Sequence, residues 1–546
     1  MKLRPYQNTA VENSINELES NASTLIVLPT GAGKTVVFSN IAKHFMTKGR
    51  VMIMAHREEL IRQASNKIKQ IVGYQPAIEM AMEWSNEDGF MKPKIVVSSV
   101  QTLSTGRILR FKPEEFSLLI TDEAHHATSD SYRKVYKHML SRGCKHLGVT
   151  ATPDRADESA LGQIFETVAM NYELPDIIHD GWLVPIRQKM ITITGLNYSN
   201  VKTTAGDLNQ ADVAAAQADE EILHSMCDPI VQMSGNKKTI VFATPGSKKS
   251  DGDTDGFHIA ERMTEIINRH KPDSARRVSQ DTPKPERRQM LQDFAAGRFQ
   301  YLVNVGVLTE GFDEPGVEMV AITRPTKSRS LYSQMIGRGT RPLPGIVDPF
   351  EHADQRRNAI DASAKSHVEV LDFVGNSGRH KLVTTADILG GNYDEDVIAK
   401  AKAKAEESDE AVDMSEMLEQ INDEIKEDKK RKLREMIIAN AAFKVTYVDP
   451  FDVFDLQPVR ERDWDKGRPP TINQIRALER LGIPVKDMTR TKAARVLDEA
   501  YRRRDEGLVS YRQIAAGADP TMTLTALNQD RFAKWSEKFR KVVSSS

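Results

Sequence analysis

The sequence predicts an α/β protein with two parallel-sheet domains in tandem, followed by a mainly helical C-terminal extension. From residue 1 to about residue 390, short apolar runs alternate with amphipathic segments of helix length, a pattern typical of parallel α/β architecture. The runs form two series, and the polar, alanine-rich stretch 206–221 between them is expected to be helical. Two series of buried strands indicate two sheets and therefore two lobes.

The first series of apolar runs predicts five strands, and the second predicts four. In chain order, the expected strands are residues 24–28, 50–54, 95–99, 118–121, 145–149, 239–243, 301–304, 319–322 and 369–371. Turn formers and charges without periodicity at 244–257 predict an exposed loop. We expect a first domain at 1–185 and a second at 186–390.

The rest of the chain is expected to form two helical regions. Lysine, glutamate and alanine dominate 399–436, with apolar residues at helical spacing, which predicts one long, mostly solvated helix in a linker at 391–450. A proline-bearing segment then leads into a small helical domain at 451–546. Thr471 and Thr489 are the expected N-caps of its helices.

Charge and cysteine content narrow the class of protein. Lys and Arg number 76 against 77 Asp and Glu, so the whole chain has no preference for a polyanion, and any nucleic-acid surface must be local. Only Cys144 and Cys227 occur, which argues against a disulfide framework or a cysteine-based zinc site. No signal core and no run of eighteen apolar residues is found, so we expect a cytoplasmic protein without a membrane partner.

A phosphate-binding loop is expected where the strand TLIVL, 24–28, meets the segment PTGAGKT, 29–35. The two glycines allow the backbone to turn so that N–H groups and a helix N-terminus face phosphate oxygens. Lys34 would reach the β and γ phosphates, and the Thr35 hydroxyl would bind Mg²⁺. The expected ATP contacts in this loop are Thr30, Gly31, Ala32, Gly33, Lys34 and Thr35.

A second cluster of chemical groups follows the expected strand at 118–121, in the sequence LLITDEAHHA. Asp122 would hold Mg²⁺ through its water shell, and Glu123 would orient and deprotonate the attacking water. His125 and His126 are either metal ligands or polar loop residues on this evidence.

Four motifs in order resemble the superfamily 2 helicases and translocases of the DEAD/DEAH-box class. They are PTGAGKT at 29–35, DEAH at 122–125, TATP at 150–153 and QMIGRGTR at 334–341. The resemblance implies two RecA-like lobes with ATP and Mg²⁺ bound in the cleft between them. It also explains Leu28, which stands where the general P-loop pattern has its first glycine, because this superfamily commonly lacks that glycine.

The resemblance also assigns nucleotide-site residues outside the two clusters. RPYQ resembles the adenine-reading element, which implies that Arg4 and Gln7 contact the nucleotide, and Gln334 is a further expected ATP contact. VLTEGFDEP at 307–315 resembles motif V, with Gly311 and Asp313 near the nucleotide.

Two arginines and a histidine have catalytic or coupling roles in the resemblance. Arg338 and Arg341 would point across the cleft at the γ-phosphate as arginine fingers. His125 would couple the nucleotide state to Thr150 and Thr152, which needs no metal role for it.

Nucleic-acid contacts are expected on both lobes. AHREEL and SSVQTL resemble first-lobe backbone-binding motifs, which nominates Arg57, Gln101 and Thr102, and Thr309 is the expected contact in motif V. Contacts of this kind position a strand without reading its sequence.

The motor sequence at 301–342 is similar to bacterial RadD-type repair helicases and related bacterial and phage helicases, which favours DNA over RNA. RadD-type chains end in a cysteine-rich zinc region, whereas this chain has no cysteine after Cys227. We expect an ATP-dependent DNA helicase or translocase in repair, recombination or replication. The alternatives are an RNA helicase and a nucleotide-switched clamp that recruits protein partners through 399–546 without processive unwinding.

Overall fold

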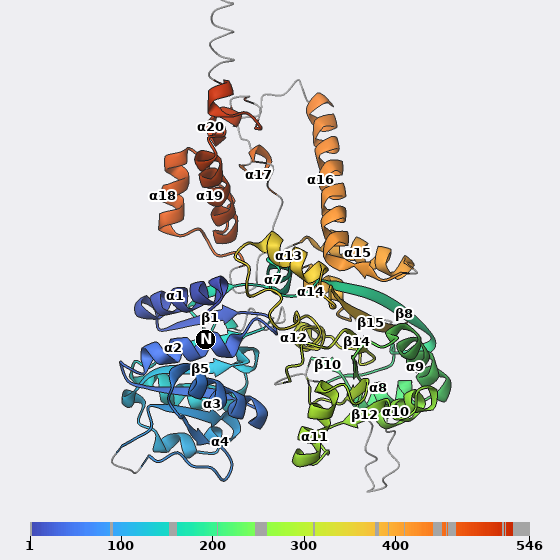
Figure 1. The fold of residues 1–546 in the computed structure, drawn as a ribbon. Helices are drawn as coiled ribbons and strands as arrows, with labels where there is room; N and C mark the ends of the chain where they lie inside the picture. The colour runs from blue at the N-terminus through green and yellow to red at the C-terminus, as the bar shows by residue number, and fades with distance from the viewer. Residues whose placement is uncertain are drawn as a thin grey trace, which may run out of the picture. The chain divides into compact units, whose positions relative to one another are not determined.

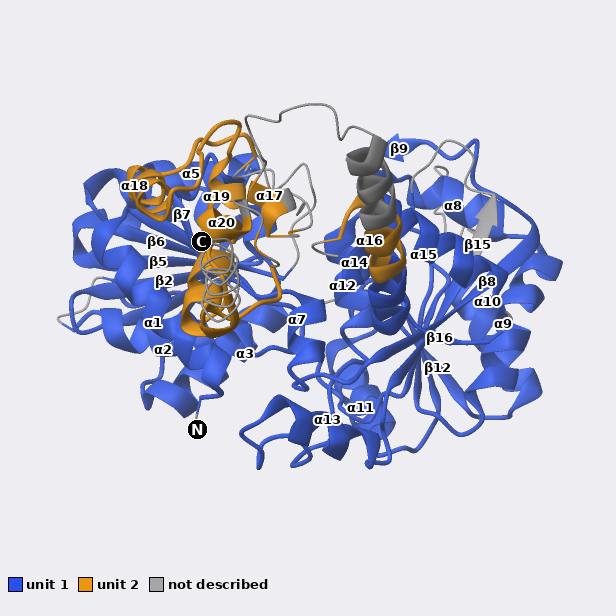
Figure 2. Cartoon of the chain, turned by 90° about the horizontal axis from the view of Figure 1, so that it is seen from above, with its two compact units in different colours: residues 1–391, 396–421 blue, residues 392–395, 422–546 orange. Residues whose placement is uncertain are grey.

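The computed structural model divides into two compact units, residues 1–391 with 396–421, and residues 392–395 with 422–546 (Figure 2). It describes residues 3–87, 91–151, 161–204, 206–245, 259–308, 312–376, 382–390, 393–408, 410–439, 450–454, 456, 466–515, 518 and 520–527.

The first unit contains two seven-stranded sheets (Figure 1). The first sheet has the order β3-β4-β2-β5-β6-β1-β7, and every neighbouring pair is parallel. Its strands are β1 Ser23–Val27, β2 Arg50–Ala55, β3 Ala77–Glu79, β4 Ile95–Ser99, β5 Phe116–Asp122, β6 Lys145–Thr150 and β7 Thr167–Asn171. Strands β1, β2 and β4 are buried at every position, as expected for parallel strands covered on both faces.

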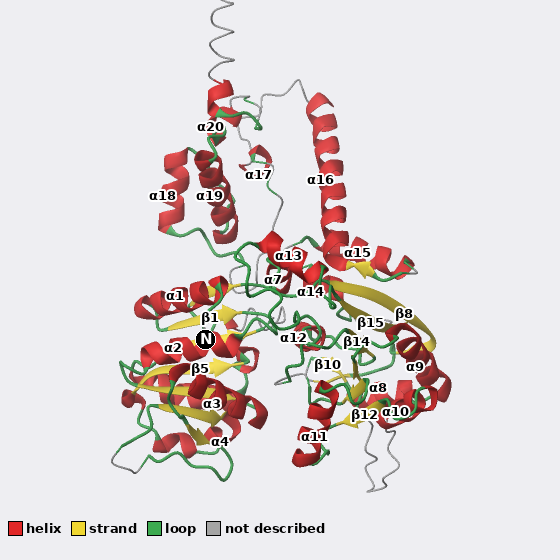
Figure 3. Ribbon diagram, in the orientation of Figure 1, coloured by secondary structure: helices red, strands yellow, loops and turns green. Residues whose placement is uncertain are grey.

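Helices surround this sheet (Figure 3). They are α1 Pro5–Ser20, α2 Lys34–Phe45, α3 Glu58–Val72, α4 Val100–Ser104 and α5 Asp130–Met139. Helix α7 Leu174–His179 follows β7 and contacts α14 Thr385–Leu389 of the second lobe. In α3, apolar residues at helical spacing are buried, and Glu58 and Glu59 occupy the first turn, where acids favour the helix dipole.

The second sheet has the order β12-β13-β11-β14-β15-β8-β16 and is parallel except for the last pair. Its strands are β8 Ile186–Asn197, β11 Thr239–Phe242, β12 Ala275–Val278, β13 Tyr301–Asn304, β14 Met319–Ile322, β15 Val368–Asn376 and β16 Val412–Asp413. A short hairpin, β9 Thr203–Thr204 with β10 Asp207–Leu208, stands apart. The lobe's helices are α8 Gln210–Gln217, α9 Glu220–Ser234, α10 Ile259–His270, α11 Lys284–Ala295, α12 Arg329–Ile336, α13 Ala353–Asp361, α14 Thr385–Leu389 and α15 Glu395–Glu407.

Every strand that the apolar runs predicted is present, which confirms the two-sheet α/β fold. Strands without a continuous apolar run were missed. β12 has the sequence ARRV, and β8 mixes buried, half-buried and exposed residues along its length. The loop expected at 244–257 lies almost wholly outside the described residues.

The helix expected in the stretch 206–221 is present as α8, with β10 before it and the start of α9 after it. The helix prediction for 399–436 was wrong. The single helix expected at 399–436 is two helices, α15 and α16 Met414–Ala439, because β16 interrupts them and pairs antiparallel with β8. Asp413 Oδ1 accepts the N–H groups of Ser415 and Glu416, so a local acid starts the second helix.

The second unit has a small core of its own among α17 Pro450–Val453, α18 Ile472–Leu481, α19 Arg490–Asp505 and α20 Tyr511–Ala515. The expected N-caps are confirmed, since Thr471 Oγ1 accepts the Gln474 N–H and Thr489 Oγ1 accepts the Lys492 N–H. Within the described part of the chain, no helix is both long and apolar enough to cross a membrane.

Candidate active site

The strand order of the first sheet brings three motifs to one edge. β5, β6 and β1 are adjacent and parallel, so their carboxyl ends lie together. The glycine loop follows β1, Asp122 ends β5 with Glu123 after it, and Thr150 ends β6. Ligands of open parallel sheets bind outside the carboxyl ends of the strands, so this edge is the place for a site.

The loop after β1 requires its glycines. Gly31 and Gly33 have φ angles of +91° and +82°, a region that favours glycine. A Cβ atom on Gly33 would also lie 2.6 Å from Gln7 Nε2. Gly33 is the N-cap of α2, so Lys34 and Thr35 occupy the first turn, where the helix dipole favours an anion.

Lys34 and Glu123 face one another across this edge. Lys34 Nζ lies 3.5 Å from Glu123 Oε1, and the two side chains are only 13% and 7% exposed. Glu123 has a φ angle of +49°, which is unusual for a residue with a side chain, and its N–H donates to Asp122 Oδ1 at 3.0 Å. Such backbone strain at a buried acid is typical of a functional position.

His125 connects the acid to the neighbouring strand. Its Nδ1 lies 3.4 Å from Glu123 Oε2 and 3.2 Å from Thr150 Oγ1. The ring of His126 packs between those of His125 and His56, at centroid distances of 4.1 and 4.6 Å. The structure therefore brings His125 and Thr150 together, whereas Thr152 lies outside the described residues.

A cleft of about 1570 Å³ runs between the two lobes of the first unit. Both lobes contribute predicted site residues to its lining. These are Arg4, Gln7, Thr30, Gly31, Gly33, Lys34, Thr35, Asp122 and Glu123 from the first lobe, and Asp313, Arg338 and Arg341 from the second.

The end of α12 and the segment after it lie against the glycine loop. A Cβ atom built on Gly31 would be 3.5 Å from both Cγ and Nε of Arg341. One built on Gly337 would be 2.8 Å from Thr30 Cβ. Arg341 pairs with Asp313, and Arg338 donates to the Phe312 carbonyl. Both arginines therefore line the same cleft as Lys34.

The charge of Arg341 persists at neutral pH. Burial, helped by repulsion from Arg4, lowers the pKa of Arg341 to about 10. The guanidinium that faces the glycine loop is therefore cationic near pH 7.

The RPYQ segment, which is expected to read adenine, makes hydrogen bonds and an ion pair with the rest of the chain. Gln7 Nε2 donates to the Ala32 carbonyl at 2.9 Å, and Gln7 Oε1 accepts the Arg4 N–H at 3.0 Å. Arg4 also pairs with Asp348 at 2.8 Å. Tyr6, which was not among the predicted residues, donates its hydroxyl to the Ala32 carbonyl at 2.9 Å. Gln334 is buried within α12 and, like Ala32, does not line the cleft.

The predicted nucleic-acid residues of the first lobe lie at the ends of β2 and β4. Arg57 Nη1 donates to the Gly306 carbonyl of the second lobe at 2.9 Å. Gln101 Nε2 donates to the His56 carbonyl at 2.9 Å, and Thr102 Oγ1 accepts the Ala81 N–H at 3.1 Å. Thr309 and Gly311 lie outside the described residues.

Lys365 supports the site, and nothing in the sequence marked it. Its Nζ donates to the carbonyls of Pro315 and Arg341, both at 2.7 Å, and the residue is 2% exposed. It thus ties the segment that contains Asp313 to the backbone of Arg341. Burial lowers the pKa of Lys365 to about 7, and a neutral amine has two N–H donors for these two carbonyls.

We expect the stability of the wild type, relative to Lys365→Met, to increase as the pH rises from 7 to 9. The folded pKa of about 7 lies below the ordinary 10.5, so between these values the unfolded chain binds the extra proton. The relative gain is about 2 kcal/mol over that interval, from the linkage of pKa to unfolding. Melting of both proteins at the two pH values measures it. Equal shifts in wild type and variant would contradict the assignment.

Two protein-family models match the chain in order. "Type III restriction enzyme, res subunit" covers residues 1–155, and "Helicase conserved C-terminal domain" covers residues 221–342.

Three curated proteins illustrate the similarity. "Putative ATP-dependent helicase IRC3" of Saccharomyces cerevisiae is 29% identical over 410 residues, which is 72% of this chain and 54% of that protein. The "51.5 kDa protein" of a Lactococcus phage is 27% identical over 58% of this chain and 62% of its own length. "DNA 3'-5' helicase XPB" of Kineococcus radiotolerans is 24% identical over 72% of this chain and 67% of that protein.

The chain thus spans about half the length of the yeast protein. The matched segments contain the glycine loop, the DEAH sequence and both arginines on the two RecA-like lobes seen here. On this combination of domains, relatives and fold, the chain belongs to the superfamily 2 helicases.

Proposed function

We propose that this chain is a nucleic-acid-dependent ATPase that uses hydrolysis to move along or unwind DNA. The observation that carries the proposal is the composition of the cleft: Lys34 and Glu123 line one side of it, and Arg341 reaches the glycine loop from the other lobe. A triphosphate in this cleft would contact both lobes at once, so its hydrolysis would change the contacts between the lobes.

Glu123 is oriented for general-base chemistry before any substrate arrives. Its two carboxylate oxygens lie 3.5 Å from Lys34 Nζ and 3.4 Å from His125 Nδ1. A carboxylate held at both oxygens can align a water and accept its proton as that water attacks the terminal phosphate. Lys34 and Arg341 would stabilise the charge that develops on the phosphate oxygens.

The residues at the cleft fit Mg²⁺. Asp122 and Thr35 both line it and offer a carboxylate and a hydroxyl, the oxygen ligands that this ion prefers. Bound Mg²⁺ would neutralise phosphate charge. Asp122 is buried, and its Oδ1 already accepts the Glu123 N–H, which fixes the carboxylate in place.

His125 is the proposed link between nucleotide state and the strand ends. It contacts the acid on one side and Thr150 on the other. A shift of Glu123 on hydrolysis would therefore move His125 and change its contact with Thr150 at the end of β6. Movement along a strand requires different affinities in the two nucleotide states, and such a link would supply them.

DNA is the proposed polymer, and the similarity to a bacterial DNA 3'-5' helicase supports it. A role in repair, recombination or replication and a cytoplasmic location belong to the same proposal. The second unit, which has its own core, is the proposed site for a protein partner.

The test compares ATP hydrolysis with single-stranded DNA, duplex DNA and RNA of matched sequence, alongside displacement of a labelled strand. We expect DNA to stimulate hydrolysis more than RNA and displacement or translocation to require ATP. Stronger stimulation by RNA would replace the proposal with an RNA helicase. Stimulated hydrolysis without displacement or translocation would favour a nucleotide-switched clamp.

A further inference from the structure

The segment that follows β3 on the first lobe carries an exposed tryptophan. The loop joins β3 to β4, and in it Trp84 is 57% exposed and Met82 is 89% exposed. Single exposed apolar side chains are normal on protein surfaces, so the surroundings of Trp84 decide what its exposure means. The described residues of the loop do not line the ATP cleft, so the ATPase chemistry does not explain them.

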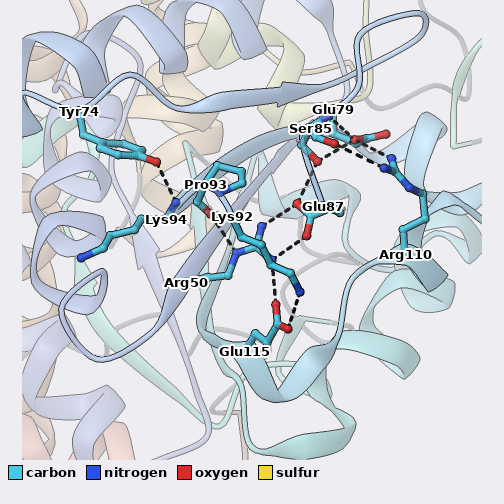
Figure 4. A network of polar contacts seen from close by, with 10 residues as sticks. All are labelled: Arg50, Tyr74, Glu79, Ser85, Glu87, Lys92, Pro93, Lys94, Arg110 and Glu115. Atoms are coloured by element: carbon cyan, nitrogen blue, oxygen red, sulfur yellow. Dashed lines mark hydrogen bonds and ion pairs between the residues drawn. The ribbon is translucent and has the colours of Figure 1, made fainter. Parts of the chain in front are cut away.

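The base of this loop is fixed by buried charges (Figure 4). Glu79 is fully buried and accepts both the N–H and the hydroxyl of Ser85, at 2.8 and 2.9 Å. The Ser85 hydroxyl also lies 3.1 Å from Glu87, which forms a bidentate pair with Arg50 at 2.6 and 2.7 Å. Arg50 also pairs with Glu115 at 3.0 Å (Figure 4).

Such a network fixes geometry more than it adds stability. Buried ion pairs lose hydration on folding, and their attraction offsets that loss only when the geometry is good. Ala81, in the same loop, has a φ angle of +48°, which costs further free energy for a residue with a side chain. Hydrogen bonds and an ion pair thus tie down the backbone on both sides of Trp84, at Glu79 and at Ser85.

The environment of the indole suits an aromatic ligand. The Arg107 guanidinium lies 3.3 Å from the Trp84 ring centroid, and that of Arg110 lies 4.8 Å away. The same two arginines pair with Glu79, at 3.3 and 3.6 Å, so they are held against the ring. Aromatic rings backed by arginine are typical platforms for the bases of single-stranded nucleic acid.

The loop adjoins a residue expected to bind the sugar-phosphate backbone. The N–H of Ala81, three residues before Trp84, donates to Thr102 Oγ1 at 3.1 Å. We propose that Trp84 stacks on a base of a single strand whose backbone runs past Thr102. This stacking proposal rests on the proposed nucleic-acid function. It adds a contact with a base to the contacts with phosphates that are expected on the first lobe.

The test uses the full chain and a fluorescently labelled twenty-nucleotide oligo(dT). We expect Trp84→Ala to weaken binding about fivefold to a hundredfold, the range for loss of one base–aromatic stack. Trp84→Phe should retain most of the affinity. Leu109→Ala removes an apolar side chain that is 74% exposed beside Arg110 but has no ring, so it is the matched control and should bind as the wild type does.

Three further measurements separate stacking from a general loss of structure. The slope of affinity against salt should be unchanged in Trp84→Ala, because stacking releases no counterions from the strand. ATP hydrolysis without nucleic acid should also be unchanged. Unlabelled oligo(dT) should quench tryptophan emission in the wild type, and that component should be absent in Trp84→Phe even though this variant still binds.

The outcomes distinguish this inference from the function on which it rests. If the wild type binds oligo(dT) and Trp84→Ala binds equally well, stacking is refuted and the proposed function stands. Quenching in Trp84→Phe as large as in the wild type, which has three other tryptophans, also refutes it. A wild type that binds no DNA or RNA overturns the proposed function, and the stacking inference falls with it. If Trp84→Ala binds DNA as tightly as the wild type but no longer binds a protein partner, the loop is a protein-recognition site instead.

Discussion

Lys34→Ala is expected to lower the kcat of ATP hydrolysis by about a hundredfold to a thousandfold or more. The Lys34 ammonium lies in the first turn of α2 and 3.5 Å from Glu123, so it would contribute charge at the proposed phosphate site and is not part of an apolar core. Hydrolysis with saturating single-stranded DNA is the measurement. Lys43→Ala, an exposed lysine on the same helix, is the matched control and should retain wild-type turnover.

Glu123→Gln is expected to lower the kcat of ATP hydrolysis about as much as Lys34→Ala does, while nucleotide binding persists. The amide keeps the shape of the side chain but cannot accept the proton of the attacking water. A fluorescent ATP analogue measures binding, and phosphate release measures turnover. Wild-type turnover in either Lys34→Ala or Glu123→Gln, with the protein folded, would refute this site.

Arg341→Ala is expected to reduce kcat by about 10³ to 10⁵, the range for loss of an arginine finger. The guanidinium reaches the glycine loop from the second lobe and stays charged near neutral pH, since its pKa is about 10. Truncation removes the charge, while the Arg341 carbonyl that Lys365 holds remains. The fall should therefore appear in kcat, with a smaller change in ATP affinity.

The matched control for this variant is Arg298→Ala. Arg298 is an arginine of the second lobe that is 67% exposed and paired with Asp293, so its removal tests loss of surface charge alone. We expect it to hydrolyse ATP as the wild type does. Equal losses in the two variants would show that Arg341 has no special place in the reaction.

The sequence could predict those parts of the site that depend on short segments. The glycine loop, Asp122 and Glu123 each follow an apolar run directly, and parallel strands bring such ends to one edge. A run of apolar residues also marks a strand that is buried on both faces. β12 contains no such run, because two arginines occupy its middle and only its two ends are buried.

Contacts between residues that lie far apart in the chain could not be predicted from the sequence. Lys365 has its partners at Pro315 and Arg341, and no local pattern distinguishes it from a surface lysine. Arg50 meets Glu87 only once β2 and the loop after β3 are in place. Charged residues read as solvated in a sequence, whereas these are buried because tertiary partners satisfy them.

The contact between Arg57 and the Gly306 carbonyl has a thermodynamic consequence. The Arg57 guanidinium has five N–H donors, but a strand phosphate that takes the N–H now donated to the Gly306 carbonyl would compete with that carbonyl for it. If Arg57 binds phosphate, each strand that docks there weakens a tie between the lobes, and by reciprocity each tightening of that tie disfavours the strand. Competition of this kind at one side chain would favour release of the strand whenever the contact between the lobes re-forms.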